Sequence, residues 1–158
     1  MNFFALLDQQ SYADRRAFIV HYPAARGKTR FAQRICQLRP GVFYIDLLDL
    51  YNASKDLPHI RNFNLKALQK LLLELPCPPS AHTVLVDHGD FLFNTWSADL
   101  KNSFNDWLKT SLRSPSKTDK TFVFFIQTDG VLSATQTVTF DQKTRTLAYA
   151  LNEFDAIY

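Results

Sequence analysis

The sequence predicts an α/β fold in which helices cover both faces of a parallel sheet. Short apolar runs of strand length occur at residues 17–22, 42–45, 83–86 and 121–126. Amphipathic stretches of helical length separate them, and such alternation is typical of parallel strands joined by crossover helices. A chain of 158 residues with 46% apolar side chains is long enough for one folded core. We therefore expect a single domain over residues 1–158.

Helical periodicity favours helices at residues 2–12, 28–38, 65–75 and 97–112. Pro40 and Pro76 fix the ends of the second and third, because the residue before a proline is disfavoured in a helix. Residues 47–62 mix apolar side chains with helix-breaking residues and receive no assignment. The apolar run at 121–126 has almost no polar side chain, which favours a central strand buried on both faces.

The last part of the chain has a different pattern. Residues 135–140 and 145–149 alternate apolar and polar side chains on either side of the polar segment 141–144. This arrangement predicts a C-terminal β-hairpin.

A glycine-containing loop joins the first predicted strand to the second predicted helix. Residues 22–29 read Tyr-Pro-Ala-Ala-Arg-Gly-Lys-Thr, which fits the phosphate-binding pattern G-x-x-x-x-G-K-[ST] with Tyr22 in place of the first glycine. In this pattern Gly27 would let the backbone approach a phosphate, Lys28 would reach the β- and γ-phosphates, and the Thr29 hydroxyl would hold Mg²⁺. The alternative is a degenerate loop that keeps only the fold.

Polar residues also follow two other predicted strands. Asp87 ends the run at 83–86, where a carboxylate would meet the Mg²⁺ shell opposite Thr29. Gln127 or Thr128 ends the fourth strand, and residues 122–128 resemble the strand that carries the polar sensor in AAA+ and related ATPases. The resemblance implies that one of these two side chains holds the attacking water or senses the γ-phosphate. The alternatives are that Asp87 caps a turn and that Gln127 and Thr128 are ordinary loop residues.

Together, these features over roughly residues 15–130 resemble the AAA+ branch of P-loop NTPases. The resemblance implies a three-layer α/β/α fold with strand order 5-1-4-3-2, with ATP and Mg²⁺ as cofactors. It implies metal ligands at Thr29 and Asp87, and catalytic roles for Asp87, His88 and Thr128. The implied nucleotide-binding segment comprises Pro23, Ala24, Ala25, Arg26, Gly27, Lys28, Thr29 and Arg30.

The chain departs from this family in three ways. Tyr22 replaces a loop glycine, no helical lid follows the fourth strand, and His88 stands where the family has its water-activating glutamate. His88 or Asp90 is the available replacement base. We expect slow hydrolysis unless a partner completes the site. By its size and its lack of a lid, the chain also resembles BrxF, the P-loop component of some BREX phage-defence systems.

These features predict an ATP-dependent subunit of a larger complex in phage defence or DNA handling, so that any DNA contact is made through that complex. The neighbour is another copy or a different protein, and Phe91, Phe93 and Trp96 are candidates for its contact surface unless they fold into the core. The alternatives are an interaction module on a relict NTPase fold and a small-molecule kinase. No apolar run reaches membrane length and no signal segment is evident, so we expect a cytoplasmic protein without membrane contact.

Overall fold

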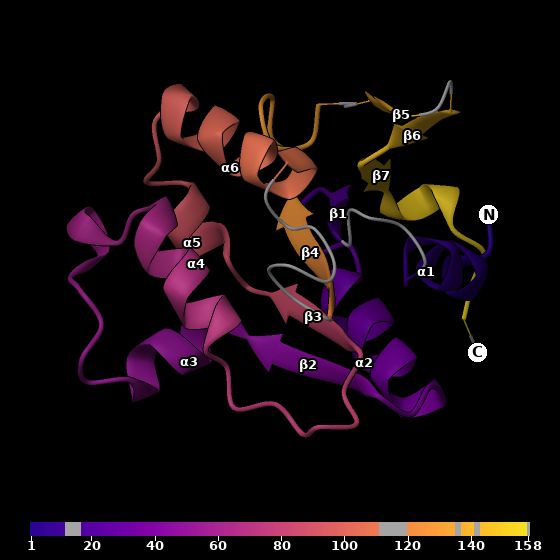
Figure 1. The fold of residues 1–158 in the computed structure, drawn as a ribbon, viewed down its shortest axis with the longest axis horizontal. Helices are drawn as coiled ribbons and strands as arrows, with labels where there is room; N and C mark the ends of the chain where they lie inside the picture. The colour runs from indigo at the N-terminus through magenta and orange to yellow at the C-terminus, as the bar shows by residue number, and fades with distance from the viewer. Residues whose placement is uncertain (12–16, 111–119, 135–136, 141–142, 158) are drawn as a thin grey trace.

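The computed structural model describes residues 1–11, 17–110, 120–134, 137–140 and 143–157 (Figure 1). Its centre is a five-stranded sheet in the order β2-β3-β4-β1-β7, with every neighbouring pair parallel. The strands are β1 (Ala17–Tyr22), β2 (Val42–Asp46), β3 (Thr83–Asp87), β4 (Thr121–Gln127) and β7 (Ala148–Ala150). The predicted α/β class and parallel sheet are confirmed, and the order is 5-1-4-3-2 with β7 in the fifth place.

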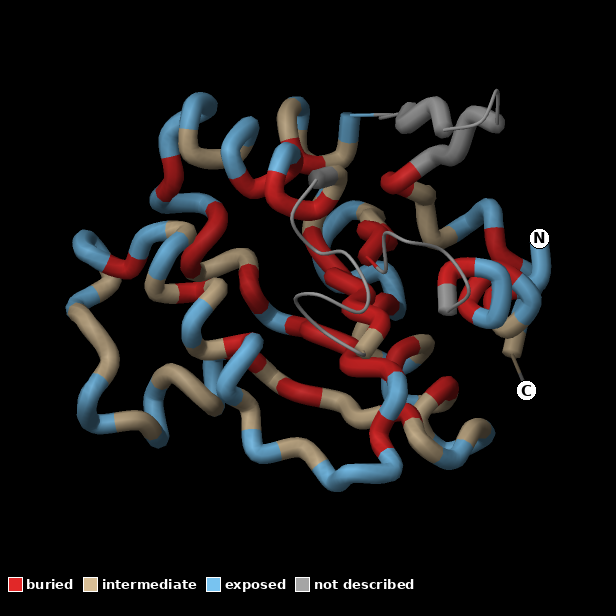
Figure 2. The backbone as a smooth tube through the Cα atoms, in the orientation of Figure 1, coloured by how far each residue is buried: buried red, intermediate tan, exposed pale blue. Residues whose placement is uncertain are grey.

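The buried strands β4 and β1 form the middle of the molecule (Figure 2). In β4, Phe122 and Phe124 point to one face of the sheet, and Val123 and Phe125 point to the other. Both sets are apolar because helices cover both faces, which explains the unbroken apolar run. The prediction of a central strand at 121–126 is confirmed.

Four helices cover one face of the sheet (Figure 1). They are α3 (Leu47–Ala53), α4 (Leu65–Leu73), α5 (Asp90–Phe93) and α6 (Ala98–Thr110). The α4 helix is shorter than predicted, since Glu74 is its cap and Pro76 disfavours a helical Leu75. The unassigned stretch 47–62 forms α3 and the short 3₁₀ helix η1 (Ile60–Asn62).

Phe104 of α6 is the centre of an aromatic cluster on this face. Its ring centroid lies 5.2 Å from Phe93, 6.0 Å from Trp96 and 5.1 Å from Phe124. Phe93 and Trp96 are 2% and 7% exposed, so the expectation that they form a partner surface is wrong. The α5 turn brings them back onto the sheet, and Phe91 is half-buried against the same core.

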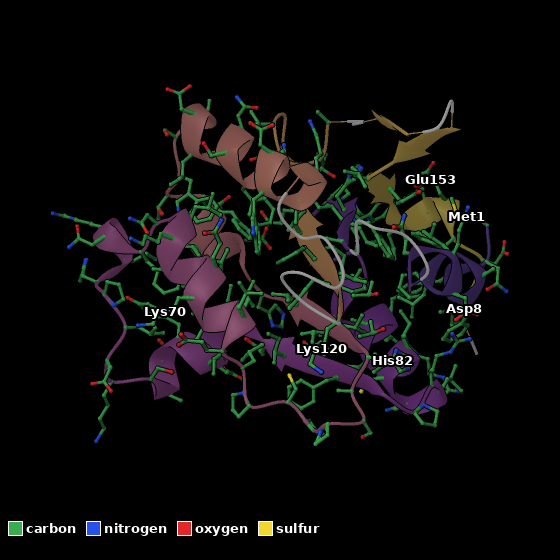
Figure 3. All side chains as sticks on the ribbon, viewed as in Figure 1. Met1, Asp8, Lys70, His82, Lys120 and Glu153 are labelled. Atoms are coloured by element: carbon green, nitrogen blue, oxygen red, sulfur yellow. The ribbon has the colours of Figure 1, made fainter. Side chains whose placement is uncertain are left out.

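The other face is covered by α1 (Phe3–Ser11) and α2 (Lys28–Leu38). Phe3 packs against Phe18 of β1 and against Phe154 near the C-terminus, with ring centroids 5.9 and 5.3 Å apart. The chain ends lie together: the Met1 amino group donates to the Glu153 carbonyl at 3.0 Å (Figure 3). The C-terminal segment therefore belongs to this layer.

The C-terminal strands differ in part from the prediction. The strands β5 (Thr137–Phe140) and β6 (Lys143–Thr146) pair antiparallel, whereas residues 135–136 and 141–142 lie outside the described residues. The predicted strand 145–149 is divided, because its second half joins β1 in the main sheet as β7. The short 3₁₀ helix η2 (Leu151–Glu153) follows. Among the described helices, none combines the length and apolar character that crossing a membrane requires.

Candidate functional site

The carboxyl ends of β1, β3 and β4 meet at one edge of the sheet. The chain leaves β1 toward the α2 face, whereas after β4 it turns to the α6 face, where Leu132 is buried. A crevice between neighbouring strands whose connections diverge in this way is the usual ligand site of parallel sheets. A cleft of about 450 Å³ lies there, lined by Ala24, Ala25, Arg26, Gly27, Lys28, Thr29, Arg30, Gln33, Asp87, His88, Asp90 and Gln127.

The loop before α2 has the backbone of an anion-binding site. Ala25 and Gly27 have φ values of +57° and +92°, and Arg26 between them does not share this region. Alternation of this kind turns successive N–H groups toward one side. Gly27 is also the N-cap of α2, where the first helical N–H groups have no intrahelical partner. A Cβ on Gly27 would meet nothing within 4 Å, so it is the positive φ that requires glycine.

Lys28 is held beneath this loop. Its side chain is largely buried, and Nζ donates to the carbonyls of Tyr22 at 3.0 Å and Pro23 at 2.9 Å. Burial lowers the pKa of Lys28, while the charges of Asp90 and Asp87 raise it by a smaller amount. The lysine is therefore fixed beside the cleft. Pro23 contributes a carbonyl to this arrangement and does not line the cleft.

Asp87 forms the opposite side of the cleft. Its side chain is only 3% exposed, and both oxygens accept hydrogen bonds, Oδ2 from the Tyr44 hydroxyl and Oδ1 from the His88 backbone N–H, each at 2.8 Å. Burial and the contact with Asp87 raise the pKa of Tyr44, so its hydroxyl stays protonated. The carboxylate is thus oriented by two donors.

His88 links Asp87's side of the cleft to the loop. Its Nδ1 lies 2.6 Å from Asp46 Oδ2, and its Nε2 lies 3.0 Å from Thr29 Oγ1. A carboxylate only accepts, so Nδ1 carries a proton; the neutral ring then accepts the Thr29 hydroxyl proton at Nε2. Its φ of +57° is an uncommon conformation for a residue other than glycine, and such residues concentrate at functional sites.

The charge on His88 is stabilised by its neighbours. Burial lowers the pKa of His88, but the hydrogen bond to Asp46 and the nearby charges of Asp87, Asp46 and Asp49 outweigh it and raise the pKa overall. Asp90, in the same turn, accepts from the Gln127 backbone N–H at 2.9 Å. Burial raises the pKa of Asp90, against the opposing effects of that hydrogen bond and of Lys28.

The fourth strand ends with two polar residues in different places. Gln127 lines the cleft, whereas the Thr128 hydroxyl lies 3.2 Å from His21 Nδ1, at the end of β1. The Thr128 backbone N–H also donates to the Tyr22 carbonyl at 3.2 Å. Of the two candidates for the polar group at this strand end, Gln127 is the one beside Lys28 and Asp90.

The sequence reasoning missed Tyr44 and Asp46. Both belong to β2, where Asp46 pairs in register with Asp87 of β3. The available signal was an aspartate directly after a predicted strand, combined with the expectation that β2 and β3 are neighbours. Asp46 has two tasks, because its Oδ1 caps α3 by accepting from Asp49 N–H at 3.0 Å while its Oδ2 bonds His88.

The candidate metal ligands at the cleft are the side-chain oxygens of Thr29 and Asp87. Among the described residues, no group of three or more His, Cys, Asp or Glu side chains is placed to hold a metal ion. Thr29 and Asp87 instead offer a hydroxyl and a carboxylate, and His88 joins them through its contact with Thr29. Mg²⁺ in nucleotide sites takes one or two protein oxygens and completes its shell with phosphates and water. The residues present fit an ion that arrives with a phosphate ligand.

The sequence matches no protein-family model, and a search of curated proteins gives no relative. The function is therefore inferred from the chemistry of the cleft. That chemistry consists of backbone donors and cations on residues 24–30, facing an oriented carboxylate on β3.

Proposed function

We propose that the protein binds ATP with Mg²⁺ in the cleft at the carboxyl edge of the sheet. One observation supports this most strongly: the helix-opening loop and Asp87 of β3 line the same cleft of about 450 Å³. Small-molecule sites typically have volumes of roughly 300–1,000 Å³. A loop with free N–H donors at a helix N-terminus favours phosphate, and a nearby carboxylate favours the cation that accompanies it.

Each side of the cleft has a separate task in this proposal. The N–H groups of residues 24–30 receive the phosphates, and Arg26, Lys28 and Arg30 supply positive charge. Thr29 and Asp87 would hold Mg²⁺, which neutralises phosphate charge when bound. His88, fixed between Asp46 and Thr29, keeps the Thr29 hydroxyl oriented toward the carboxylate side.

We further propose that the isolated chain hydrolyses ATP slowly. His88 follows Asp87 in the chain and is a candidate base, but both of its ring nitrogens already have partners. Asp90 has a raised pKa, which makes it a candidate base, and its Oδ1 is used by Gln127. Thr128 would act on the site through β1, where it contacts His21. A neighbour that supplied an arginine could raise the rate by about 10³–10⁵.

The proposed role is that of an AAA+-like, nucleotide-dependent subunit of a larger assembly. That assembly would be a phage-defence or DNA-handling complex, in which the chain would take the place that BrxF has in BREX systems. The described residues after β4 form strands and the 3₁₀ helix η2, so no helical lid from this part of the chain covers the cleft. An incomplete site of this kind gains from a neighbouring subunit that supplies a missing catalytic group. The neighbour is a second copy or a different protein.

Calorimetry tests the binding proposal directly. ATP is titrated into the purified protein with and without Mg²⁺, and any nucleotide that copurifies is identified by mass spectrometry. We expect saturable binding that is tighter with Mg²⁺. Folded protein that binds no ATP under either condition would contradict the proposal. Ultracentrifugation with and without ATP tests the assembly, for which a larger species is expected with ATP or with the native partner.

A further inference from the structure

A second groove continues from the cleft along the exposed side of α2. It has a volume of about 600 Å³ and lies between α2 and the C-terminal residues Ala156 and Ile157. Gly27, Arg30 and Gln33 line both this groove and the cleft. The two spaces are therefore joined at the first turns of α2, so one extended ligand could occupy both.

The chemistry of the groove differs from that of the cleft. Phe31 and Ile157 give it apolar surface, and Arg34 and Gln33 give it planar hydrogen-bonding groups. Among its described lining residues there is no carboxylate, whereas Asp87 and Asp90 line the cleft. Apolar surface with guanidinium and amide groups suits a flat heterocycle, which stacks on such planes and uses its edge for hydrogen bonds.

The guanidinium of Arg34 is held along this side of the helix. Its Nη1 donates to Gln37 Oε1 at 3.2 Å, and both residues line the groove. An arginine whose plane is already oriented loses less conformational freedom when a ring stacks on it. The groove thus presents a partly ordered planar cation next to the apolar surface.

Packing immediately before Ile157 fixes the C-terminal side of the groove. Phe154 is 8% exposed, and its ring centroid lies 6.0 Å from Phe31 and 5.3 Å from Phe3. The Asp155 backbone N–H donates to the Met1 carbonyl at 2.8 Å. Ala156 and Ile157 are consequently placed by α1 and the aromatic core of this face.

We infer that this groove binds the nucleoside half of the nucleotide, with the C-terminal segment as the surface opposite α2. The inference rests on the proposed function, because it assumes that the phosphates occupy the cleft. In this arrangement residues 156–157 cover the base and ribose, the part of the ligand that the loop does not reach. The protein then needs no helical lid to distinguish a nucleotide from a free polyphosphate.

A pair of ligands separates the two halves of the site. Mg-ATP carries phosphates and a nucleoside, whereas Mg-tripolyphosphate carries phosphates alone. Ala156→Trp fills the groove, Arg34→Ala removes the oriented cation, and Leu73→Trp is a matched control on α4, where Leu73 is 43% exposed. Circular dichroism establishes that each variant is folded, and calorimetry gives both affinities.

We expect Ala156→Trp to weaken Mg-ATP binding by about tenfold or more, and Arg34→Ala by about fivefold, in line with the energy of base stacking. Tripolyphosphate binding should be unchanged in both, and Leu73→Trp should resemble the wild type. Unchanged ATP affinity in the two groove variants, or an equal loss for both ligands, would overturn the inference. A wild type that binds neither ligand would instead refute the proposed phosphate site, and this inference with it.

Discussion

The two sides of the cleft are built in different ways. On the carboxylate side, defined here as Tyr44, Asp46, Asp87 and His88, the polar side chains bond one another within the fold. On the loop side, residues 24–30, the main resource is a run of backbone donors shaped by two positive φ values. On the carboxylate side, the hydrogen-bonding groups of Asp87, Asp46 and His88 already have partners within the protein. The loop side keeps donors for a ligand, so changes there should affect binding more than folding.

The largest expected effect is on the loop side, at Lys28. Lys28→Met keeps the buried stem but removes a charge-assisted contact to phosphate, a class of hydrogen bond worth about 1.5–3 kcal/mol. We therefore expect calorimetry to show ATP affinity reduced by about 10- to 150-fold. The free energy of unfolding should fall by about 1–2 kcal/mol, because the hydrogen bonds to the Tyr22 and Pro23 carbonyls are lost as well.

Lys66→Met on the exposed side of α4 is the matched control, with affinity expected to equal that of the wild type. If Lys28→Met bound ATP normally, Lys28 would serve only to hold the loop carbonyls.

The next largest effect is expected on the carboxylate side, where a substitution changes both the Mg²⁺ dependence of ATP binding and the stability of the fold. Asp87 accepts hydrogen bonds from two donors, and Asp87→Asn places its NH₂ group against one of them, so that one hydrogen bond is lost. We therefore expect a folded protein whose free energy of unfolding is reduced by about 1 kcal/mol. The gain in ATP affinity on adding Mg²⁺ should fall by about tenfold, because a neutral amide is a weaker Mg²⁺ ligand than a carboxylate.

Tyr44→Phe provides the control for Asp87. It removes the hydrogen bond between the Tyr44 hydroxyl and Asp87 but keeps the carboxylate, and should lower the free energy of unfolding by about 1 kcal/mol while leaving the Mg²⁺ effect intact. An Asp87→Asn protein that responds to Mg²⁺ as the wild type does would make Asp87 only a turn residue.

A smaller effect is expected from the loop backbone. Gly27→Ala has room for its Cβ but must keep a φ of +92°, a region that costs other residues about 1–2 kcal/mol. We expect the free energy of unfolding to fall by about 1 kcal/mol and ATP affinity to fall severalfold as the loop relaxes. Chemical denaturation and calorimetry measure the two quantities.

Gly130→Ala is the control, since a Cβ there also meets nothing within 4 Å and its φ lies outside the positive region. Equal destabilisation by the two substitutions would mean that the conformation of Gly27 has no special cost.

The smallest effect is a difference between two histidines. Burial lowers the pKa of His21 at the end of β1, although Glu153 raises it in part, whereas the carboxylates around His88 raise its pKa. NMR titration should place His88 above and His21 below the ordinary value of about 6.5. Asp46→Asn should lower the pKa of His88 and leave that of His21 unchanged; the opposite order of the two histidines would contradict the hydrogen bond to Asp46.

These shifts have opposite consequences for stability. His88 contributes stability that is fully present below about pH 6.5 and is lost as the pH rises through its raised folded-state pKa. His21 binds its proton more readily in the unfolded chain, so stability falls as the pH drops from about 6.5 through its lowered folded-state pKa. Denaturation of Asp46→Asn across this range should show the His88 contribution reduced.

Features encoded locally were predictable from the sequence. The strands at 17–22 and 83–86, the helix at 28–38 and the loop between Tyr22 and Thr29 follow from neighbouring residues alone. Apolar runs, helical periodicity and a glycine at a helix start act within about ten residues of the chain. The nucleotide site itself was a prediction from motif spacing, and it remains a proposal.

Other features were decided only by the tertiary structure, because they depend on which distant segments of the chain become neighbours. The alternating pattern at 145–149 fits a hairpin strand and a sheet edge equally well, and only pairing with β1 places residues 148–150 in the main sheet. Trp96 is buried where its indole N–H donates to the Phe63 carbonyl, Asp46 enters the site because β2 pairs with β3, and Ile157 reaches the groove because Phe154 packs on Phe31. Each of these contacts joins residues far apart in the chain, so its energy appears only once the layers have packed.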